Sequence, residues 1–258
     1  MRGRLLLVFL LSLLLFLMVN MPVVQLFRFS APPPDVGIEG LEGSLLAGRV
    51  RRLTLRGLAF EDVEYRLRPL CLLRLALCYR LESDAGDLLL QLSASPWSGI
   101  GIEDSRVTLP LPQLTALAPT LLVRPTGELE LVVDQAGLDQ GRLTGLKATA
   151  YWREAGIEGE KLKLGDFRAD AERSDQGLDV RFSDLPGSLV GVDGSLRLGE
   201  RDYRLDLKLE ARPGLADSVR SALELLARKN GLNRYRVQQQ GQLPRPLPLL
   251  AAEDPGQS

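Results

Sequence analysis

The clearest hydrophobic pattern in the chain is a strict alternation of apolar and charged residues between positions 202 and 212. Because successive side chains of a β-strand point to opposite faces, this pattern predicts a strand with one face on a core and the other in water. The apolar positions are Tyr203, Leu205, Leu207, Leu209 and Ala211. The same period recurs at 49–58, 62–68, 106–109, 127–133, 142–151, 159–171, 178–182, 192–198 and 234–242.

Short turn signals separate these segments, among them Asp84-Ala-Gly86, Pro125-Thr-Gly127 and Asp175-Gln-Gly177. Strands joined by short turns are typical of an antiparallel meander. A sheet with one apolar face has to bury that face by curling into a groove or by folding over as a sandwich. The sequence therefore predicts a mainly β fold, a curled antiparallel meander sheet that is either a groove or a sandwich.

One longer helix is expected at 215–230, before Gly231. Its apolar residues recur at helical spacing, which is typical of a face packed on a core. Arg228 and Lys229 would lie in its last turn and Gly231 at the left-handed cap position. A shorter helical piece is expected within 111–119. The apolar stripe of the longer helix consists of Leu215, Val219, Ala222, Leu223 and Leu226.

An uncharged, mostly apolar run of 23 residues, from 5 to 27, lies near the N-terminus. It is long enough to cross a bilayer core of about 30 Å as a helix. A cleaved secretory signal is the alternative, but suitably placed small residues for cleavage are missing. Arg2 and Arg4 precede the run and favour a cytoplasmic N-terminus. We therefore expect a single-pass protein of the bacterial inner membrane with the bulk of the chain in the periplasm.

The expected organisation of the chain has five parts. They are a cytoplasmic tail at 1–4, a transmembrane anchor at 5–27, a linker at 28–35, a periplasmic β-rich domain at 36–243 and a disordered Pro-rich tail at 244–258. The linker contains three consecutive prolines, which prevent the helix from continuing.

The chain has two cysteines, Cys71 and Cys78. An exported location permits one disulfide between them if the backbone turns over the intervening residues. Both cysteines also lie among leucines, and free cysteine often behaves as a small buried apolar residue. The sequence leaves the candidate disulfide and the two buried thiols as alternatives.

The composition excludes several classes of enzyme and binding protein. Without any His, the chain has neither a Ser-His-Asp triad nor a His-ligated zinc site, and two Cys are too few for a four-thiolate site. A balance of 32 basic against 33 acidic residues argues against nucleic-acid binding. The adjacent acids Glu61-Asp62 and Glu103-Asp104 would point to opposite faces of a strand. We therefore expect no enzyme activity, no catalytic or metal-binding residues and no cofactor.

Three segments carry a family resemblance. They are 36–50, with its Gly-x-x-Gly spacing, 63–73, with Arg68-Pro-Leu70, and 216–242, with Asn233-Arg-Tyr235 and Gly241. In order and spacing they resemble protein N of the bacterial type II, or general, secretion pathway. The sequence departs from the family at Leu45 or Leu46 and at Tyr65, where the family favours Trp, and at Asn233, where it favours Gly.

The resemblance implies an inner-membrane, periplasm-facing accessory of the machine that moves folded proteins across the outer membrane. The family has no known active site to carry over to this chain. Its architecture is similar to that of AsmA-like and bridge-like lipid-transfer proteins, whose sheets form apolar grooves. This second likeness is an analogy of fold.

Two functional hypotheses follow. In the first, the chain is a non-enzymatic component of the type II secretion system that acts through contacts with other inner-membrane subunits, for which exposed strand edges are suited. In the second, it is a periplasmic lipid-binding or lipid-transfer module. The alternation fits both hypotheses, because an open groove and a closed sandwich have the same pattern. The candidate apolar groove face contains Leu129, Leu131, Leu205, Leu207 and Leu209.

Overall fold

The computed structural model of the chain describes residues 36–55, 57–115, 124–157 and 163–250. The chain divides into two compact units, Met1–Pro96 and Trp97–Ser258, which are described separately below. The apolar run at 5–27 lies outside the described residues. Within the described ranges, no helix has both the length and the hydropathy needed to cross a bilayer.

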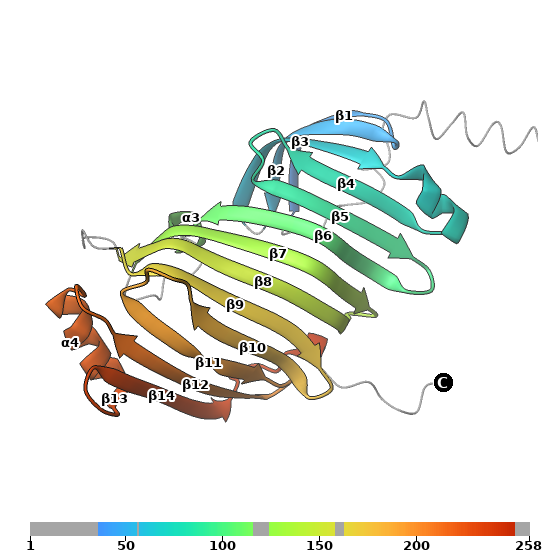
Figure 1. Cartoon of the computed structure of the whole chain (residues 1–258). Helices are drawn as coiled ribbons and strands as arrows, with labels where there is room; N and C mark the ends of the chain where they lie inside the picture. Colours follow the sequence, from blue (N-terminus) through green and yellow to red (C-terminus); the bar gives the residue numbers. More distant parts are fainter. Residues whose placement is uncertain (1–35, 56, 116–123, 158–162, 251–258) are drawn as a thin grey trace, which may run out of the picture. The chain divides into compact units, whose positions relative to one another are not determined.

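The first unit is an antiparallel meander of five strands, which Figure 1 shows in blue to green. A short 3-10 helix, η1 (Pro69–Arg74), interrupts the meander between the third and fourth strands. The strands are β1 (Val36–Gly43), β2 (Ala47–Leu55), β3 (Leu58–Leu67), β4 (Leu77–Ser83) and β5 (Leu88–Ser95).

The core of the first unit lies on the face where the apolar positions of β2, β3 and β5 meet. Cross-strand pairing places Leu53 opposite Phe60 and Val50 opposite Val63, and all four side chains are buried. Leu88 of β5 is buried as well. Because Val50 and Leu53 are three residues apart, as are Phe60 and Val63, the strict alternation is interrupted between them, where Asp62 has a positive φ of 50°.

Two tyrosines hold the turn between β1 and β2 against this core. The Tyr65 hydroxyl donates to the Ser44 carbonyl (2.8 Å), and the Tyr79 hydroxyl donates to the Leu45 carbonyl (3.1 Å). Burial raises the pKa of both phenols. Gly48 lies opposite Tyr65, and a Cβ there would lie only 2.3 Å from the Tyr65 hydroxyl oxygen. Because glycine has no Cβ, position 48 leaves room for the Tyr65 side chain.

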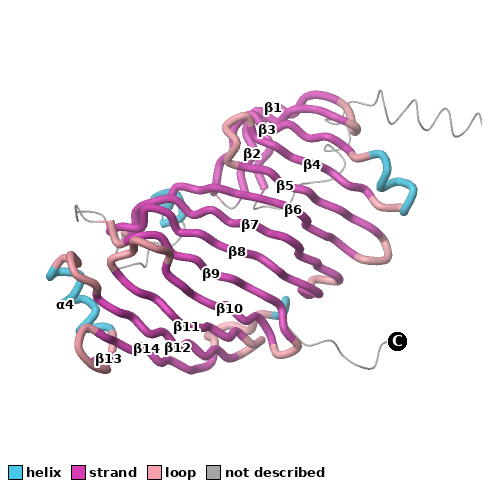
Figure 2. The backbone as a smooth tube through the Cα atoms, in the orientation of Figure 1, coloured by secondary structure: helices cyan, strands magenta, loops and turns pink. Residues whose placement is uncertain are grey.

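The second unit is a longer antiparallel meander with helices at its margins, as Figure 2 shows. Its successive strands are β6 (Gly99–Pro110), β7 (Pro125–Asp139), β8 (Arg142–Ile157), β9 (Gly165–Ser174), β10 (Gly177–Asp184), β11 (Val190–Leu198), β12 (Asp202–Ala211) and β14 (Arg234–Gln242). A two-residue strand, β13 (Arg228–Lys229), pairs with β14. The helices are α3 (Leu111–Thr115), α4 (Asp217–Leu226) and the 3-10 helix η2 (Pro248–Leu250). The mainly β, antiparallel prediction is confirmed.

The predicted helix at 215–230 is wrong at its C-terminal end. Helix α4 ends at Leu226, and Ala227 is extended (φ −131°, ψ 150°). Arg228 and Lys229 then pair with β14 as β13, so they do not form a basic last turn, and Gly231 (φ +124°) lies in the turn between β13 and β14. Pairing with β14 supplies these residues with backbone hydrogen bonds that a continued helix would otherwise provide.

The described part of the apolar stripe packs on the core of the second unit, at the end of the sheet where Figure 1 places α4. Leu215, just before the helix, and Val219 are buried together with Val190, Ala211 and Tyr235, and Leu223 packs against this cluster. Helix α4 thus covers one end of β11, β12 and β14.

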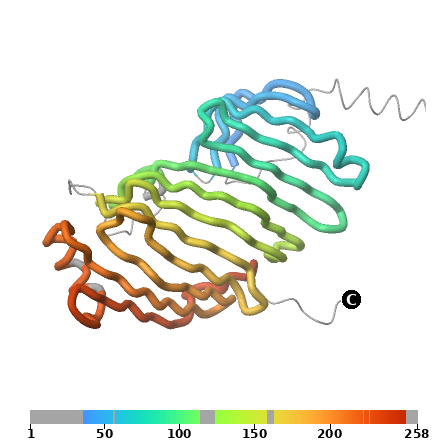
Figure 3. Tube along the Cα trace, in the orientation of Figure 1, coloured from blue at the N-terminus to red at the C-terminus, as the bar shows by residue number. Residues whose placement is uncertain are grey.

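The Pro-rich segment expected to be disordered from residue 244 instead packs on the second unit as far as Leu250. Leu243 N donates to the Arg201 carbonyl and Leu247 N donates to the Glu200 carbonyl (both 2.8 Å). Leu250 is buried, and its carbonyl accepts a hydrogen bond from Arg173 Nη1 (3.3 Å). In Figure 3 the chain can be followed through β14 to this segment. Buried apolar surface at Leu250 compensates for ordering the segment.

The opposite face of the second unit carries cross-strand ion pairs. Among them, Arg236 makes two charge-assisted hydrogen bonds to Asp206 (2.9 and 2.6 Å), and Gln238 adds a third (3.1 Å). The Arg236 guanidinium is the main cause that lowers the pKa of Asp206 from 3.8 to about 2. This carboxylate ties β12 to β14 on the face turned to water.

The lowered pKa of Asp206 predicts a specific acid sensitivity. Because the folded pKa lies below the unfolded value, the contribution of Asp206 to stability is complete above pH 3.8 and is lost as the pH falls through about 2. We expect Asp206→Asn to lose less stability between these pH values than the unchanged chain. Urea unfolding as a function of pH measures this. Asp193→Asn, which removes a more exposed carboxylate paired with Lys208 on the same face, is the control. Equal acid sensitivity of Asp206→Asn and the unchanged chain would contradict the assignment.

Candidate interaction surfaces

The described residues hold no group of three or more His, Cys, Asp or Glu side chains that could bind a metal ion. The adjacent acids singled out in the sequence are engaged locally. Glu61 accepts a hydrogen bond from Arg52 (3.1 Å), while Asp62 and Asp104 have positive φ values of 50° and 42° within their strands. A catalytic site needs converging groups, but Glu61 and Asp62 belong to β3 whereas Glu103 and Asp104 belong to β6.

The five leucines of the candidate apolar face lie on one face of the second unit but at separate places. Leu129 and Leu131 belong to β7, and Leu205, Leu207 and Leu209 belong to β12. Four strands, β8 to β11, lie between them. With strands spaced by about 4.8 Å, the two groups are roughly 24 Å apart, so they do not line one small pocket.

Cross-strand pairing connects the two groups through a continuous row of residues on the same face. We call this the apolar row: Leu131, Ala150, Ala169, Phe182, Gly194, Leu207 and Val237, each paired with the next. None of these seven residues is fully buried, and Leu131 is 38% exposed. A closed sandwich would bury the middle of its inner face. The observed exposure therefore favours an open apolar face over a closed core along this row.

The apolar face is covered mainly near the ends of the strands. At one end lie α4 and the cluster around Tyr235, and at the other lies Leu250 against β8 and β9. Ile100 and Leu138, which pair with each other on β6 and β7, are exposed like Leu131. The sequence pattern contained no signal for how far the face is covered.

A second candidate surface is the outer edge of β14. At the two ends of the pairing with β12, Leu243 N donates to Arg201 O and Ala211 N donates to Asn233 O. Backbone groups alternate in direction along a strand, so odd-numbered residues of β14 face β12 and even-numbered ones face the outer edge. Asn230 N, which donates to Arg234 O on the other side, agrees with this assignment.

Most of this outer edge has no neighbouring strand among the residues that the structure describes. Strand β13 pairs only with Tyr235 and Arg236. Gln238, Gln240 and Gln242 therefore direct their backbone N–H and C=O groups outward beyond β13. The segment 237–242 contains no charge and no proline, the two features by which edge strands usually discourage pairing with another chain.

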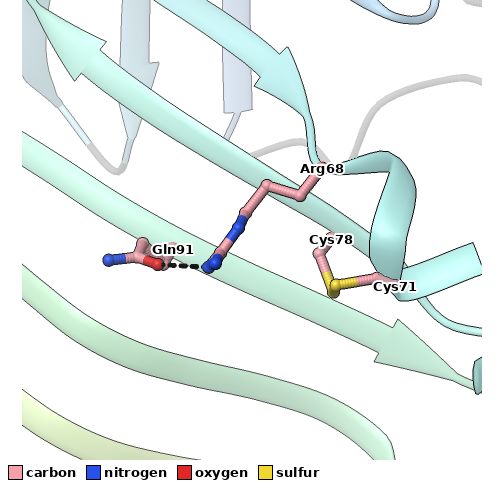
Figure 4. The surroundings of a disulfide bond; sticks show 4 residues. All are labelled: Arg68, Cys71, Cys78 and Gln91. Carbon is pink, nitrogen blue, oxygen red and sulfur yellow. Dashed lines mark hydrogen bonds between the residues drawn. A yellow bond between two sulfur atoms is a disulfide. The ribbon is translucent and has the colours of Figure 1, made fainter.

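A third surface is the loop between β3 and β4, in which the structure joins Cys71 and Cys78 by a disulfide (Figure 4). The Cα atoms of the two cysteines are 5.9 Å apart. Arg68 donates from Nη1 to Gln91 Oε1 (2.8 Å) and so fixes the start of the loop to β5. Hydrogen bonds from Leu75 N to Leu72 O and from Ala76 N to Cys71 O close the turn.

The leucines of this loop point into solvent. Leu70 is 78% exposed, Leu73 84% and Leu75 68%. Sequence reasoning treated the loop only as the surroundings of the two cysteines and missed this exposure. The available signal was the absence of alternation between Pro69 and Leu77, which leaves no face for these leucines to bury.

Comparisons with known proteins agree with the resemblance seen in the sequence. The family model for the type II secretion system protein N matches residues 34–238. The type II secretion system protein N of Aeromonas hydrophila is 28% identical over 243 residues, which cover 91% of this chain and 96% of that protein. No solved structure matches the chain. Because the family model spans well over half of the sequence, the chain belongs to the type II secretion system protein N family.

Proposed function

We propose that the chain is an inner-membrane-anchored, periplasm-facing component of the type II secretion system that acts through contacts with other subunits of that system and not as an enzyme. Its membership of the protein N family supports the assignment to the system. The apolar run at 5–27 and the preceding Arg2 and Arg4 support a single span with a cytoplasmic N-terminus.

The open edge of β14 is the observation that carries the role in protein contact. An extended segment of a partner can add to an exposed edge through main-chain hydrogen bonds. The edge offers outward backbone groups at Gln238, Gln240 and Gln242, and the Asp206 to Arg236 ion pair joins the strand to β12. A partner strand that pairs here would continue the antiparallel order of the unit.

Proline at position 240 tests this edge. Gln240→Pro removes one outward N–H and no bond to β12, and proline is tolerated on the outer side of an edge strand. We expect the free energy of unfolding to change by less than about 1 kcal/mol, while co-purification of other secretion subunits and secretion by the intact system both fall several-fold. Pull-down from envelopes and assay of secreted protein measure the two effects.

The neighbouring position supplies the matched control. Gln239→Pro removes a bond to β12 and should destabilise the fold, whereas Gln240→Thr keeps the outward N–H and should bind and secrete normally. A Gln240→Pro variant that folds and retains full co-purification and secretion would contradict a contact through this edge.

Membrane anchoring is tested separately. We expect the full-length chain to remain in the membrane fraction after carbonate extraction, and protease added to spheroplasts to digest the described domain. Replacing residues 1–30 by a cleavable signal should release the remainder as a soluble periplasmic protein. Release of the unchanged chain by carbonate would contradict the anchor.

A lipid-binding role is the second candidate, because the apolar row stays partly exposed across β7 to β14. We expect phospholipid or lipopolysaccharide to co-purify with the chain, as native mass spectrometry with lipid extraction would detect. Leu131→Glu should reduce the bound lipid several-fold, while the free energy of unfolding changes by less than about 1 kcal/mol, because this side chain already reaches water.

Gln135→Glu introduces the same charge on the opposite face of β7, opposite Lys147, and should leave lipid binding unchanged. In a closed core, Leu131→Glu would cost several kcal/mol. That result, or equal lipid in both variants, would reject the lipid role for this face.

A further inference from the structure

We propose that the disulfide-closed loop between β3 and β4 docks on the headgroup region of an anionic bilayer. We call the segment from Arg68 to Cys78 the leucine loop. Docking on a bilayer is distinct from the proposed contact with other subunits, because it involves a separate surface and a different class of partner.

Exposed apolar side chains are close together in the leucine loop. Leu70, Leu73 and Leu75 are each more than two-thirds exposed within six consecutive residues. Single exposed leucines are common on soluble proteins and need no explanation, but contiguous apolar patches mark sites of interaction. The disulfide and the hydrogen bonds within the turn close the loop in which these side chains are exposed.

The leucine loop and its flanking residues are basic. Between Tyr65 and Leu81 the chain has four arginines, Arg66, Arg68, Arg74 and Arg80, and no acidic residue, although the whole chain has a net charge of −1. Arg66 and Arg80 are paired with Glu64 and Glu82, which flank this stretch. Arg68 and Arg74 lie within the leucine loop itself. Leucines bracketed by arginines fit a surface with an apolar interior and anionic headgroups, because arginine can pair with lipid phosphate while leucine enters the acyl boundary.

The linker limits the distance between the first unit and the proposed anchor. Only residues 28–35 separate the apolar run at 5–27 from β1 of the same unit. Eight extended residues span at most roughly 28 Å. With the proposed anchor, the first unit therefore stays near the membrane. This step rests on the proposed function, so the experiment has to read the loop separately from the anchor.

A tryptophan placed in the leucine loop provides this reading. Leu73→Trp is made in the full-length chain, reconstituted in vesicles of phosphatidylglycerol and brominated phosphatidylcholine, whose bromines quench tryptophan in the acyl region. The matched control is Leu225→Trp, at a leucine that is 87% exposed on α4 but stands beside Glu224. Fluorescence of the unchanged chain, with its two native tryptophans, is subtracted from both.

We expect the tryptophan at position 73 to be quenched roughly two-fold, as for a side chain within the headgroup and acyl boundary, and the one at position 225 to be unaffected. Adding Arg74→Gln to Leu73→Trp should lower the ratio of docked to free loop about five-fold. Leu70→Trp, at another exposed position of the loop, repeats the measurement should Leu73→Trp fail to form the disulfide.

Two results would overturn the proposal. Equal quenching at positions 73 and 225 would show that the loop stays in water and would leave its leucines to a protein partner. Equal quenching at position 73 in vesicles without phosphatidylglycerol would reject an anionic surface. Carbonate extraction of the same vesicles reports the anchor independently, so a chain that resists extraction without loop quenching separates failure of this inference from failure of the anchor.

Discussion

Hydrogen bonding between successive antiparallel strands is the constraint on which the rest of this structure depends. A slip of one residue in any pairing would turn every leucine of that strand to the charged face. The observed pairing of Leu205 with Leu196 and of Asp206 with Ser195 keeps the two faces distinct along β12. On the other side of β12, the pairing with β14 places Asp206 opposite Gln238 and diagonal to Arg236, so the ion pair depends on this second register.

Pairing within a single meander does not bury its apolar face, which has to be covered by other parts of the chain. Helix α4 covers one end with Val219, and the C-terminal segment covers part of the other with Leu250. The apolar row lies between these two covered ends, and its residues remain partly exposed. Burial of leucine contributes about 1.5–3 kcal/mol when complete, so an uncovered row forgoes stability. An apolar ligand bound along the row would recover part of this burial, and this is the physical basis of the proposed lipid-binding role.

The sequence predicted local features well and long-range ones poorly, for physical reasons. Alternation predicted the strand at 202–212 because it is a property of consecutive residues. The end of α4 could not be predicted in this way, since Arg228 and Lys229 leave the helix to pair with β14, a strand that follows them in the chain. Leu250 is similar, because its burial depends on contact with β8 and β9. Leu73 is exposed because it lies in a loop without alternation, where no strand face is available to bury it.

The distribution of charge bears on the three proposed contact surfaces. On the charged face of the second unit, Lys208 pairs with Asp193 and Arg197 pairs with Asp179, and exposed pairs of this kind contribute little net free energy. The proposed recognition therefore uses features that charge pairing does not neutralise. These are the backbone groups along the outer edge of β14, the apolar row, and the leucine loop with its two arginines. They differ in chemistry and belong to different elements, so the proposed contacts with a protein strand, an acyl chain and a membrane surface do not rely on the same residues.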